Sequence, residues 1–398
     1  MPRRADAGIG FVQAVGGWQN AGTRYLIQKS DRVFYSVQVD ASSDVSFRKS
    51  SDGGLTWTAP VVVFAGTATY LSVWYDRWSN VAGDLIHCAY TESGTHDTLY
   101  RTINTASSDA LSTQTVIFAG ASQVASVGHL SIVRAVGGNV YCKTVIDAGA
   151  EGGFYRLPNA NVPSGAWDAA RTVDETIATL DHMILQPDFD AADTQDIMGI
   201  FWDASADEIS RKLYDDSANS WSETSIATSM AELTATTGGP NFCAIPDPTN
   251  TQSILAAWSA TDAANADLRI WTVDSGTISE KTNVVLNSVD DQGLVALSID
   301  MRTGWWWVFY CGASGGGETW NTALRMYCKV SQDGGTTWGA ETKVGPADNV
   351  ARTIRGIWAA PWAYTPPALL WVEDGTTEDL LKINVDHTLP RATYQIGV

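Results

Sequence analysis

The stretch Arg32-Val-Phe-Tyr-Ser-Val-Gln-Val39 is a short run of mostly apolar and aromatic residues, as expected for a buried β-strand. Similar runs recur along the chain, and each is followed by a polar turn. The other six are Asp84-Leu-Ile-His-Cys-Ala-Tyr90, Asn139-Val-Tyr-Cys-Lys-Thr-Val145, Asp196-Ile-Met-Gly-Ile-Phe-Trp202, Ser253-Ile-Leu-Ala-Ala-Trp258, Trp305-Trp-Trp-Val-Phe-Tyr310 and Ala368-Leu-Leu-Trp-Val372. Helical periodicity is largely missing, so the pattern predicts an all-β protein.

A basic residue near the middle of the next predicted strand marks the same repeat. Successive members lie 53 to 58 residues apart, and they are Arg48, Arg101, Arg156, Arg211, Arg269, Arg325 and Lys382. A sustained period of this length is typical of a β-propeller, whose blades of four strands take roughly 40 to 50 residues each.

The repeat predicts how the 398 residues are organised. We expect residues 1–398 to form a single domain, a seven-bladed β-propeller of four-stranded antiparallel blades. The seventh unit has only three predicted strands, and a spare strand lies near the N-terminus. We therefore expect residues 9–15 to complete the last blade and close the ring.

Two turns after a predicted third strand share one motif, Ser-x-Asp-x-Gly-x-Thr-Trp. They are Ser50-Ser-Asp52-Gly-Gly54-Leu-Thr56-Trp57 and Ser331-Gln-Asp333-Gly-Gly335-Thr-Thr337-Trp338. The aspartate can accept N–H bonds of the turn, and glycine can take positive φ. The motif resembles the Asp box, or BNR repeat, of sialidases and related β-propellers. That resemblance implies a structural role at the outer edge of the propeller, away from an active site.

The chain departs from sialidases in two respects. Sialidases have six blades, and their first catalytic arginine follows an aromatic residue in a Phe/Tyr-Arg-Ile-Pro motif on an innermost strand. The nearest match, Tyr155-Arg-Leu-Pro158, falls on a predicted third strand. We therefore expect no sialidase activity. Seven-bladed relatives include ulvan-type polysaccharide lyases, other glycoside hydrolases and non-catalytic adhesion or assembly modules.

Propeller function usually lies around the axis, where the innermost strands begin. Counting back from each second strand gives a ring of polar residues at these starts: Arg24, Tyr70, His129, His182, Asn241, Gln292 and Arg355. Histidine and tyrosine could exchange protons with a sugar while arginine holds an anionic group. Ulvan-type lyases resemble this set in using His, Tyr and Arg. Alternatively, the residues simply line a wet channel.

Composition narrows the range of partners. The chain has 25 basic and 44 acidic side chains, a net charge of −19, and no basic stripe, which argues against binding nucleic acid or anionic membranes. No apolar stretch is long enough to span a membrane, and no signal peptide is apparent. Five scattered cysteines predict neither disulfides nor a zinc site. We expect no cofactor and no metal, although calcium in the aspartate-rich turns stays open.

Two hypotheses for function follow. The first is a non-catalytic propeller that serves as a structural or glycan-binding module of an extracellular assembly, such as a phage virion protein (capsid or tail) released by lysis. Its expected partners are glycans or other virion or surface proteins. Its ligand-binding candidates are Arg24, Tyr70, His129, His182, Asn241 and Arg355. Exposed tryptophans could also stack on sugars, and the candidates at strand ends or in loops are Trp18, Trp74, Trp78, Trp320 and Trp362.

The second hypothesis is a carbohydrate-active enzyme, a polysaccharide lyase or glycosidase. Its catalytic candidates are Tyr70, His129 and His182, with Arg24 and Arg355 as partners. The net charge of −19 argues against a polyanionic substrate, because only a local basic cluster could offset it.

Overall fold

The structure is a computed structural model in which thirteen segments of the 398-residue chain are described. They are residues 7–13, 25–40, 42–120, 130–144, 153–173, 182–203, 206–230, 242–260, 266–288, 293–311, 325–345, 354–373 and 379–384. In these segments the protein is almost entirely β-structure, with two short 3-10 helices, η1 (Asp76–Ser79) and η2 (Asn159–Asn161). None of the described helices has the length and apolar character needed to cross a membrane.

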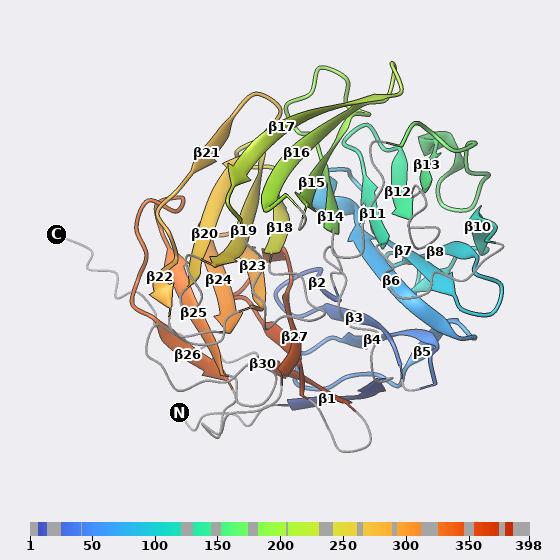
Figure 1. Ribbon diagram of the computed structural model, residues 1–398. Helices are drawn as coiled ribbons and strands as arrows, with labels where there is room; N and C mark the ends of the chain where they lie inside the picture. Colours follow the sequence, from blue (N-terminus) through green and yellow to red (C-terminus); the bar gives the residue numbers. More distant parts are fainter. Residues whose placement is uncertain are drawn as a thin grey trace.

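Small antiparallel sheets are arranged around a central axis, as in a β-propeller (Figure 1). Blade 1 contains β2 (Leu26–Gln28), β3 (Phe34–Val39), β4 (Val45–Ser50) and β5 (Val61–Phe64). Blade 2 contains β6 (Ala68–Tyr75), β7 (Leu85–Glu92), β8 (Thr98–Asn104), β9 (Ala110–Leu111) and β10 (Thr115–Phe118). Blade 3 contains β11 (Leu130–Arg134), β12 (Val140–Thr144) and β13 (Gly153–Leu157).

The next three blades continue around the axis. Blade 4 contains β14 (His182–Pro187), β15 (Ile197–Asp203), β16 (Glu208–Asp215) and β17 (Ser220–Thr228). Blade 5 contains β18 (Phe242–Asp247), β19 (Gln252–Ala260), β20 (Ala266–Val273), β21 (Ile278–Glu280) and β22 (Val285–Ser288). Blade 6 contains β23 (Val295–Asp300), β24 (Trp305–Cys311), β25 (Met326–Ser331) and β26 (Thr342–Gly345).

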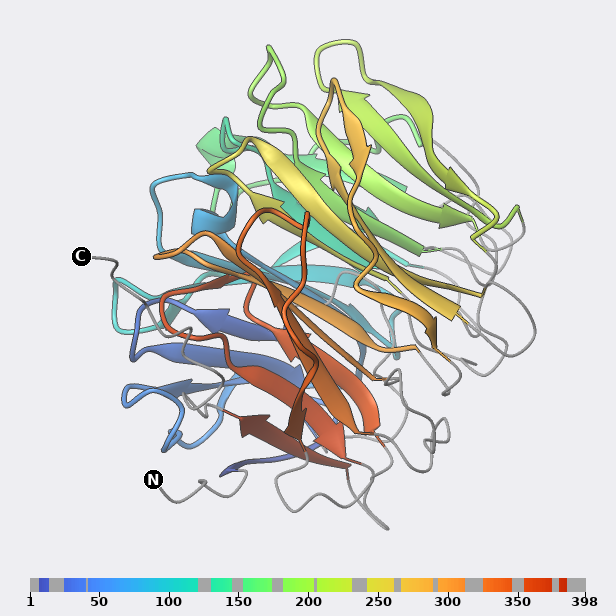
Figure 2. The ribbon, with the colours of Figure 1, turned by 90° about the vertical axis from the view of Figure 1, so that its left-hand side faces the viewer.

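The remaining sheet combines strands from both ends of the chain. Its order is β27 (Ile354–Ala359), β29 (Leu369–Glu373), β30 (Asp379–Asn384) and then β1 (Ala7–Gln13) at the outer edge. Figure 2, turned by 90°, shows β1 and β30 together on the outside of this sheet. The short strand β28 (Trp362–Ala363), which lies between β27 and β29 in sequence, leaves the sheet and pairs in parallel with β23 of blade 6.

The expectation of seven four-stranded blades closed by the N-terminal strand is wrong. If a blade is a sheet whose antiparallel strands follow one another in the chain, the described residues form six blades and one composite sheet, and blade 3 has three strands. The N-terminal strand lies at the outer edge beside β30, whereas the first and last sheets meet through β2 with β27 and β28. The ring is therefore joined by inner strands rather than closed by β1.

Proline explains why β27 and β29 do not form a simple hairpin. Pro361, Pro366 and Pro367 lie in the connection and lack the N–H that a sheet ladder needs. Pro361 acts as an acceptor instead, because the N–H of Ile299 donates to its carbonyl at 2.9 Å. The periodicity of the sequence gives no sign of this crossover, since it records only the apolar runs.

The segment around β28 crosses the ends of several innermost strands, and we call residues 360–366 the strap. The buried Trp362 indole N–H donates to the carbonyl of Pro246 in blade 5 at 2.8 Å. The Ser298 hydroxyl donates to the Ala360 carbonyl at 2.6 Å, and the Gln28 amide donates to the Thr365 hydroxyl at 2.9 Å. The strap therefore ties blades 1, 5 and 6 together near the axis.

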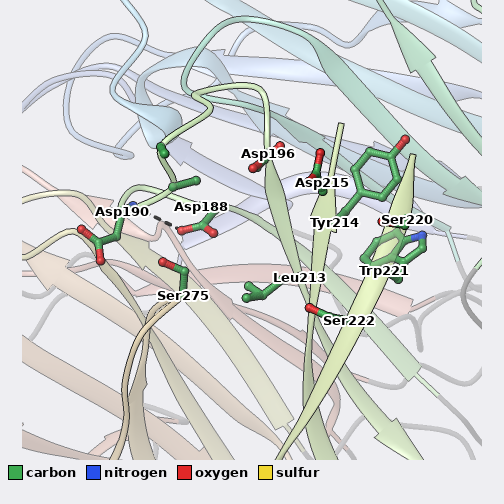
Figure 3. Close-up of a pocket in the computed structure, with 12 residues that line it drawn as sticks. Asp188, Asp190, Asp196, Leu213, Tyr214, Asp215, Ser220, Trp221, Ser222 and Ser275 are labelled. Atoms are coloured by element: carbon green, nitrogen blue, oxygen red, sulfur yellow. Dashed lines mark hydrogen bonds between the residues drawn. The ribbon is translucent and has the colours of Figure 1, made fainter. Parts of the chain in front are cut away.

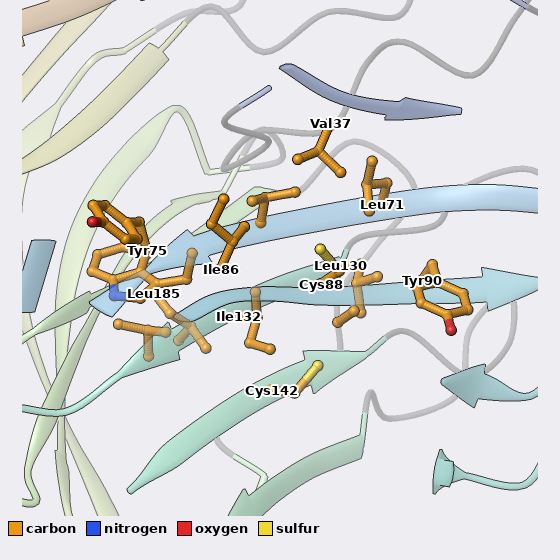
Figure 4. Close-up of a cluster of buried hydrophobic side chains, with 14 of the residues drawn as sticks. Val37, Leu71, Tyr75, Ile86, Cys88, Tyr90, Leu130, Ile132, Cys142 and Leu185 are labelled. Atoms are coloured by element: carbon orange, nitrogen blue, oxygen red, sulfur yellow. The ribbon is translucent and has the colours of Figure 1, made fainter. Parts of the chain in front are cut away.

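The core lies between the blades. The seven apolar runs of the sequence form second strands, which are covered on both faces by neighbouring sheets. Figure 4 shows side chains of blades 2 and 3 meeting in this way, with Ile86 and Cys88 of β7 near Ile132 of β11 and Cys142 of β12. The five cysteines are free, and four of them are buried, as expected for structural thiols.

Replacing Trp362 with alanine should destabilise the protein by about 3–5 kcal/mol, because a buried indole and its bond to blade 5 are both lost. Trp362→Phe keeps most of the apolar contact and should cost less. Urea unfolding followed by circular dichroism measures the difference. Trp305→Ala, at the half-buried tryptophan that begins β24 and lies outside the strap, is the control. Equal losses at Trp305 and Trp362 would contradict the role given to the strap.

Candidate functional site

The structure describes only part of the predicted axial ring. Tyr70 lies in β6 of blade 2 and His182 begins β14 of blade 4, and both side chains are half-buried. Arg355 lies in β27, but its side chain is outside the described part. Arg24, His129, Asn241 and Gln292 also lie outside the described residues. Convergence of the ring, and an enzyme that uses it, therefore stay predictions.

The tryptophans predicted to stack on sugars are placed differently. Trp74, Trp78 and Trp362 are buried, so they are core residues and not exposed platforms. Trp18 and Trp320 lie outside the described residues. Trp74 and Trp78 pack edge to face, with ring centroids 5.5 Å apart, and the Trp74 indole donates to the Ser79 hydroxyl. Burial of their rings excludes a direct role in ligand binding.

The two turns with the Ser-x-Asp-x-Gly-x-Thr-Trp motif have the same internal geometry. In the first, the Ser50 hydroxyl donates to Asp52 and accepts the N–H of Gly54, and the Thr56 hydroxyl donates to Asp52 at 2.6 Å. These bonds lower the pKa of Asp52 to about 2, mainly through Thr56. Gly54 has a φ of 86°, which favours glycine. Trp57 completes the turn, and its indole donates to the Gly54 carbonyl.

The second turn repeats the serine and threonine bonds, but its tryptophan bonds a neighbouring blade instead of its own turn. Ser331 and Thr337 both donate to Asp333, and Gly335 has a φ of 84°. The Trp338 indole donates to the carbonyl of Thr282 in the blade 5 connection at 2.8 Å. The turn therefore fastens blade 6 to blade 5, and its residues are occupied in structural contacts.

A groove lies at the corresponding turns of blade 4, on the side of the ring where the innermost strands end (Figure 3). Its volume is about 430 Å³. It is lined by the loop after β14, by the β16–β17 turn and by one residue of blade 5. We call it the blade 4 groove, and its lining residues are Asp188, Asp190, Ala191, Ala192, Asp196, Leu213, Tyr214, Asp215, Ser220, Trp221, Ser222 and Ser275.

Aspartate-rich turns build two walls of the groove. After β14, the N–H of Asp190 donates to the Asp188 carboxylate at 3.2 Å. In the β16–β17 turn, the Asp215 carboxylate accepts the Ser217 hydroxyl and the N–H of Ala218, both at 2.7 Å. Aspartate favours such turns because its short side chain can bond the backbone two or three residues ahead. The loops are therefore ordered by some of the carboxylates that line the groove.

An aromatic pair forms another wall. The rings of Tyr214 and Trp221 lie 4.9 Å apart, and Phe154 of blade 3 packs against both. Tyr214 is buried, while Trp221 is half-buried and its indole donates to the Thr172 carbonyl at 3.0 Å. This bond corresponds to that of Trp338 in blade 6. The Trp221 ring is thus held in one orientation at the edge of the groove.

The carboxyl groups of the groove differ in proton affinity. Burial raises the pKa of Asp188, which is 4% exposed. Burial also raises the pKa of Asp196 to about 6, and the nearby charges of Asp193, Asp215 and Asp188 act in the same direction. Bonds from Ala218 and Ser217 instead lower the pKa of Asp215. At neutral pH, ionised Asp196 and Asp215 therefore give the groove negative charge.

The basic residues near the groove bind carboxylates that do not belong to its lining. Arg156 of blade 3 binds Asp168 and Asp216 at 2.6 and 2.7 Å, and Arg171 binds Asp216 at 3.0 Å. Arg156 of the sequence Tyr155-Arg-Leu-Pro158 therefore joins blade 3 to blade 4. No Lys, Arg or His belongs to the groove lining. Within the described segments, no group of three or more His, Cys, Asp or Glu side chains could hold a metal ion.

A second cluster of ionisable side chains lies between blades 2 and 3 and is closed to solvent. His87 is fully buried between the Asp76 carboxylate at 2.7 Å and the Tyr100 hydroxyl at 2.6 Å. Arg134 of blade 3 binds Asp76 at 2.5 Å. Although burial opposes it, the charges of His87 and Arg134 hold the pKa of Asp76 below its usual value. These buried contacts join two blades rather than form a ligand site.

The sequence prediction missed the blade 4 groove. The turn Asp215-Asp-Ser-Ala-Asn-Ser-Trp221 keeps only the aspartate and the tryptophan of the Ser-x-Asp-x-Gly-x-Thr-Trp motif, and the loop after β14 resembles any other aspartate-rich turn. The available signal was the density of carboxylates at 188, 190, 193 and 196, followed by an aromatic residue in the next turn. Sequence distance alone does not show that these turns face each other.

Comparison with known proteins identifies the class of protein as a β-propeller. No family model matches the chain, and no curated protein matches it. A solved polysaccharide lyase of a new family, an ulvan lyase, is similar with a TM-score of 0.56 and 11% identity, over 94% of this chain and 95% of that one. At this identity the likeness shows the fold alone.

Two further similar structures are of proteins that bind carbohydrate or act on it. A mutant lectin from Aleuria aurantia with α-methyl-L-fucoside has a TM-score of 0.46 and 12% identity, over 94% and 96% of the two chains. An α-L-arabinanase from Penicillium chrysogenum with arabinobiose has a TM-score of 0.45 and 14% identity, over 66% and 79%. These three similar structures are thus carbohydrate-active propellers. They give no support to the predicted virion role, and they do not confirm membership of the sialidase-like superfamily.

The raised pKa of Asp196 predicts a specific pH dependence of stability. Aspartates of an unfolded chain have a pKa of about 3.9, so the folded protein holds the proton of Asp196 more tightly than the unfolded chain does. The contribution of Asp196 to the free energy of unfolding is therefore fully present at low pH. It is lost as the pH rises through about 6. Asp196→Asn should therefore gain stability relative to wild type between pH 4 and 7. Urea midpoints across this range measure the gain.

The control is Asp31→Asn, which removes the same charge from an exposed turn of blade 1. Its stability difference from wild type should change less over the same pH range. A difference between Asp196→Asn and wild type that stays constant with pH would contradict the raised pKa.

Proposed function

We propose that the protein is a non-catalytic, glycan-binding β-propeller and that the blade 4 groove is a binding site. The observation that carries the proposal is the composition of this groove, which combines an aromatic edge with carboxylate and hydroxyl groups in a volume of about 430 Å³. That volume lies within the usual range of roughly 300–1,000 Å³ for small-molecule sites.

Each wall suits a sugar ring. A pyranose has a face of C–H groups that can pack on the half-exposed ring of Trp221, and its hydroxyls are donors and acceptors. The carboxylates of Asp190 and Asp215 are exposed, so they are available to accept hydroxyl bonds. Ser220 and Ser222 add hydroxyls on the same strand. The fixed orientation of Trp221 reduces the entropy lost on binding.

The proposal also covers two predictions made from the sequence, the role of the two Ser-x-Asp-x-Gly-x-Thr-Trp turns and the setting in which the protein works. We propose that Ser50, Asp52, Gly54, Thr56 and Trp57, and their counterparts Ser331, Asp333, Gly335, Thr337 and Trp338, are Asp boxes with a structural role. Support comes from the identical hydrogen bonds of the two turns. A place in an extracellular assembly is the biological setting that we propose.

Filling the groove should abolish glycan binding. Ser222 is exposed on β17 and lines the groove, so Ser222→Trp should lower affinity about tenfold or more by steric exclusion while leaving the core intact. A glycan array identifies ligands, and titration calorimetry measures their affinity for wild type and variant. Ser225→Trp places the same side chain on the same strand outside the groove lining and should bind as wild type.

Two results would contradict the proposal. One is equal affinity of Ser222→Trp and wild type for every ligand found on the array. The other is accumulation of an absorbing, unsaturated product when the protein is incubated with uronate polymers, which would identify a lyase.

A further inference from the structure

We infer that the blade 4 groove selects glycans that carry free, protonated amino groups. This inference rests on the proposed function and adds the chemical class of its ligand. The groove lining contains four carboxyl groups, from Asp188, Asp190, Asp196 and Asp215, and no basic side chain. Uronic or sulfated sugars would meet like charge there, whereas an ammonium group would meet complementary charge.

The carboxylates of the groove form no ion pair with the basic residues that the structure describes. None of the four forms a salt bridge in the described part of the chain. The nearby arginines are held by other groups: Arg156 and Arg171 bind Asp216, and Arg211 donates to the Asp274 carbonyl and to Thr224. The charge of Arg211 still acts on Asp188, but the two side chains form no salt bridge. A ligand can therefore supply the missing positive charge.

Asp188 gives the strongest support for a ligand that carries an ammonium group. It is 4% exposed, lines the groove and receives the N–H of Asp190. Among the described residues Arg211 acts on its charge, but no cation forms a salt bridge with it. A charged group this deeply buried is costly unless it is paired. An ammonium group that enters the groove would offset this cost and form a charge-assisted hydrogen bond. A neutral N-acetyl group offers a single amide N–H and carries no charge.

The aromatic wall distinguishes an amino sugar from other cations. Trp221 and the serine hydroxyls of Ser220, Ser222 and Ser275 fit the flat face and the hydroxyls of a pyranose. A polyamine or a basic peptide would use the carboxylates and leave these groups without a counterpart. The combination of carboxylates and aromatic ring thus favours a sugar that bears an amine.

The inference also predicts an optimum pH for binding. The titratable and charged groups that act on the groove are Asp188, Asp190, Asp193, Asp196, Asp215, Asp274 and Arg211. Affinity for an amino sugar should rise with pH as Asp196 ionises near 6. It should fall again when the amine of the ligand loses its proton.

The test compares β-1,4-linked glucosamine oligomers with N-acetylglucosamine oligomers of equal length by calorimetry at pH 6.5 and low salt. The full-length protein should bind the free amine at least about tenfold more tightly, a difference of about 1.4 kcal/mol. Asp188→Asn and Asp196→Asn should each reduce this preference several-fold. The exposed control Asp31→Asn should keep it, and Ser222→Trp should bind neither oligomer.

The outcomes separate the inference from the proposed function. Equal or tighter binding of the N-acetylated oligomer, blocked by Ser222→Trp, would overturn the inference and leave glycan binding in place. Oligolysine of equal charge that binds as tightly as the amino sugar and competes with it would also overturn the inference, because charge alone would then suffice. If the wild-type protein binds no glycan on the array, the proposed function itself is refuted.

Discussion

The packing of one blade against the next is the constraint on which the rest of the structure depends. A single blade cannot bury its own apolar faces, so its apolar middle strands must be covered on both faces by neighbouring blades. Burial of the second strands provides this cover, as in the contacts between Ile86 of β7 and Ile132 of β11. Such packing does not fix the rotation of one sheet against another, because apolar contacts have no preferred direction.

Directional contacts at the outer strands supply the missing specificity. The repeated basic residue of the third strand reaches a neighbouring blade in several units, as when Arg101 donates to the Val63 carbonyl at 2.6 Å and Arg156 binds Asp216. Trp221 and Trp338 make equivalent indole bonds to the preceding connection. Both kinds of contact repeat with the blade, which explains why a basic residue and a turn tryptophan recur in the sequence.

The sequence predicted these repeated features well because each reflects a local requirement of every blade. Apolar runs marked second strands. The basic residue marked the third strand in six units, whereas Arg325 comes just before β25. The crossover of Trp362 to blade 6 was unpredictable, since it depends on where prolines interrupt one hairpin. The position of β1 shows the same limit. Its pattern indicated a strand beside the last sheet, but not that inner strands would join the ring.

The candidate site was harder to predict than the fold, because it arises from residues that do not repeat. Asp188 and Asp215 come from different turns of one blade, and Ser275 comes from the next. Their proximity depends on the twist between strands, which leaves no periodic signal. The axial ring had such a signal, since its members begin equivalent strands. Only Tyr70 and His182 of that ring have described side chains.

The net charge of −19 is linked to the way in which the blades are joined. Of the 25 basic residues, several on third strands bond neighbouring blades, where Arg101 and Arg211 donate to carbonyls and Arg156 binds the carboxylate of Asp216. The 44 acidic residues are more numerous, and many lie in turns, where aspartate bonds the backbone without needing a cation. Unpaired carboxylates therefore gather where aspartate-rich turns of one blade face each other, and in blade 4 they surround a groove. The same division of charges that holds the blades together thus gives the groove its negative potential.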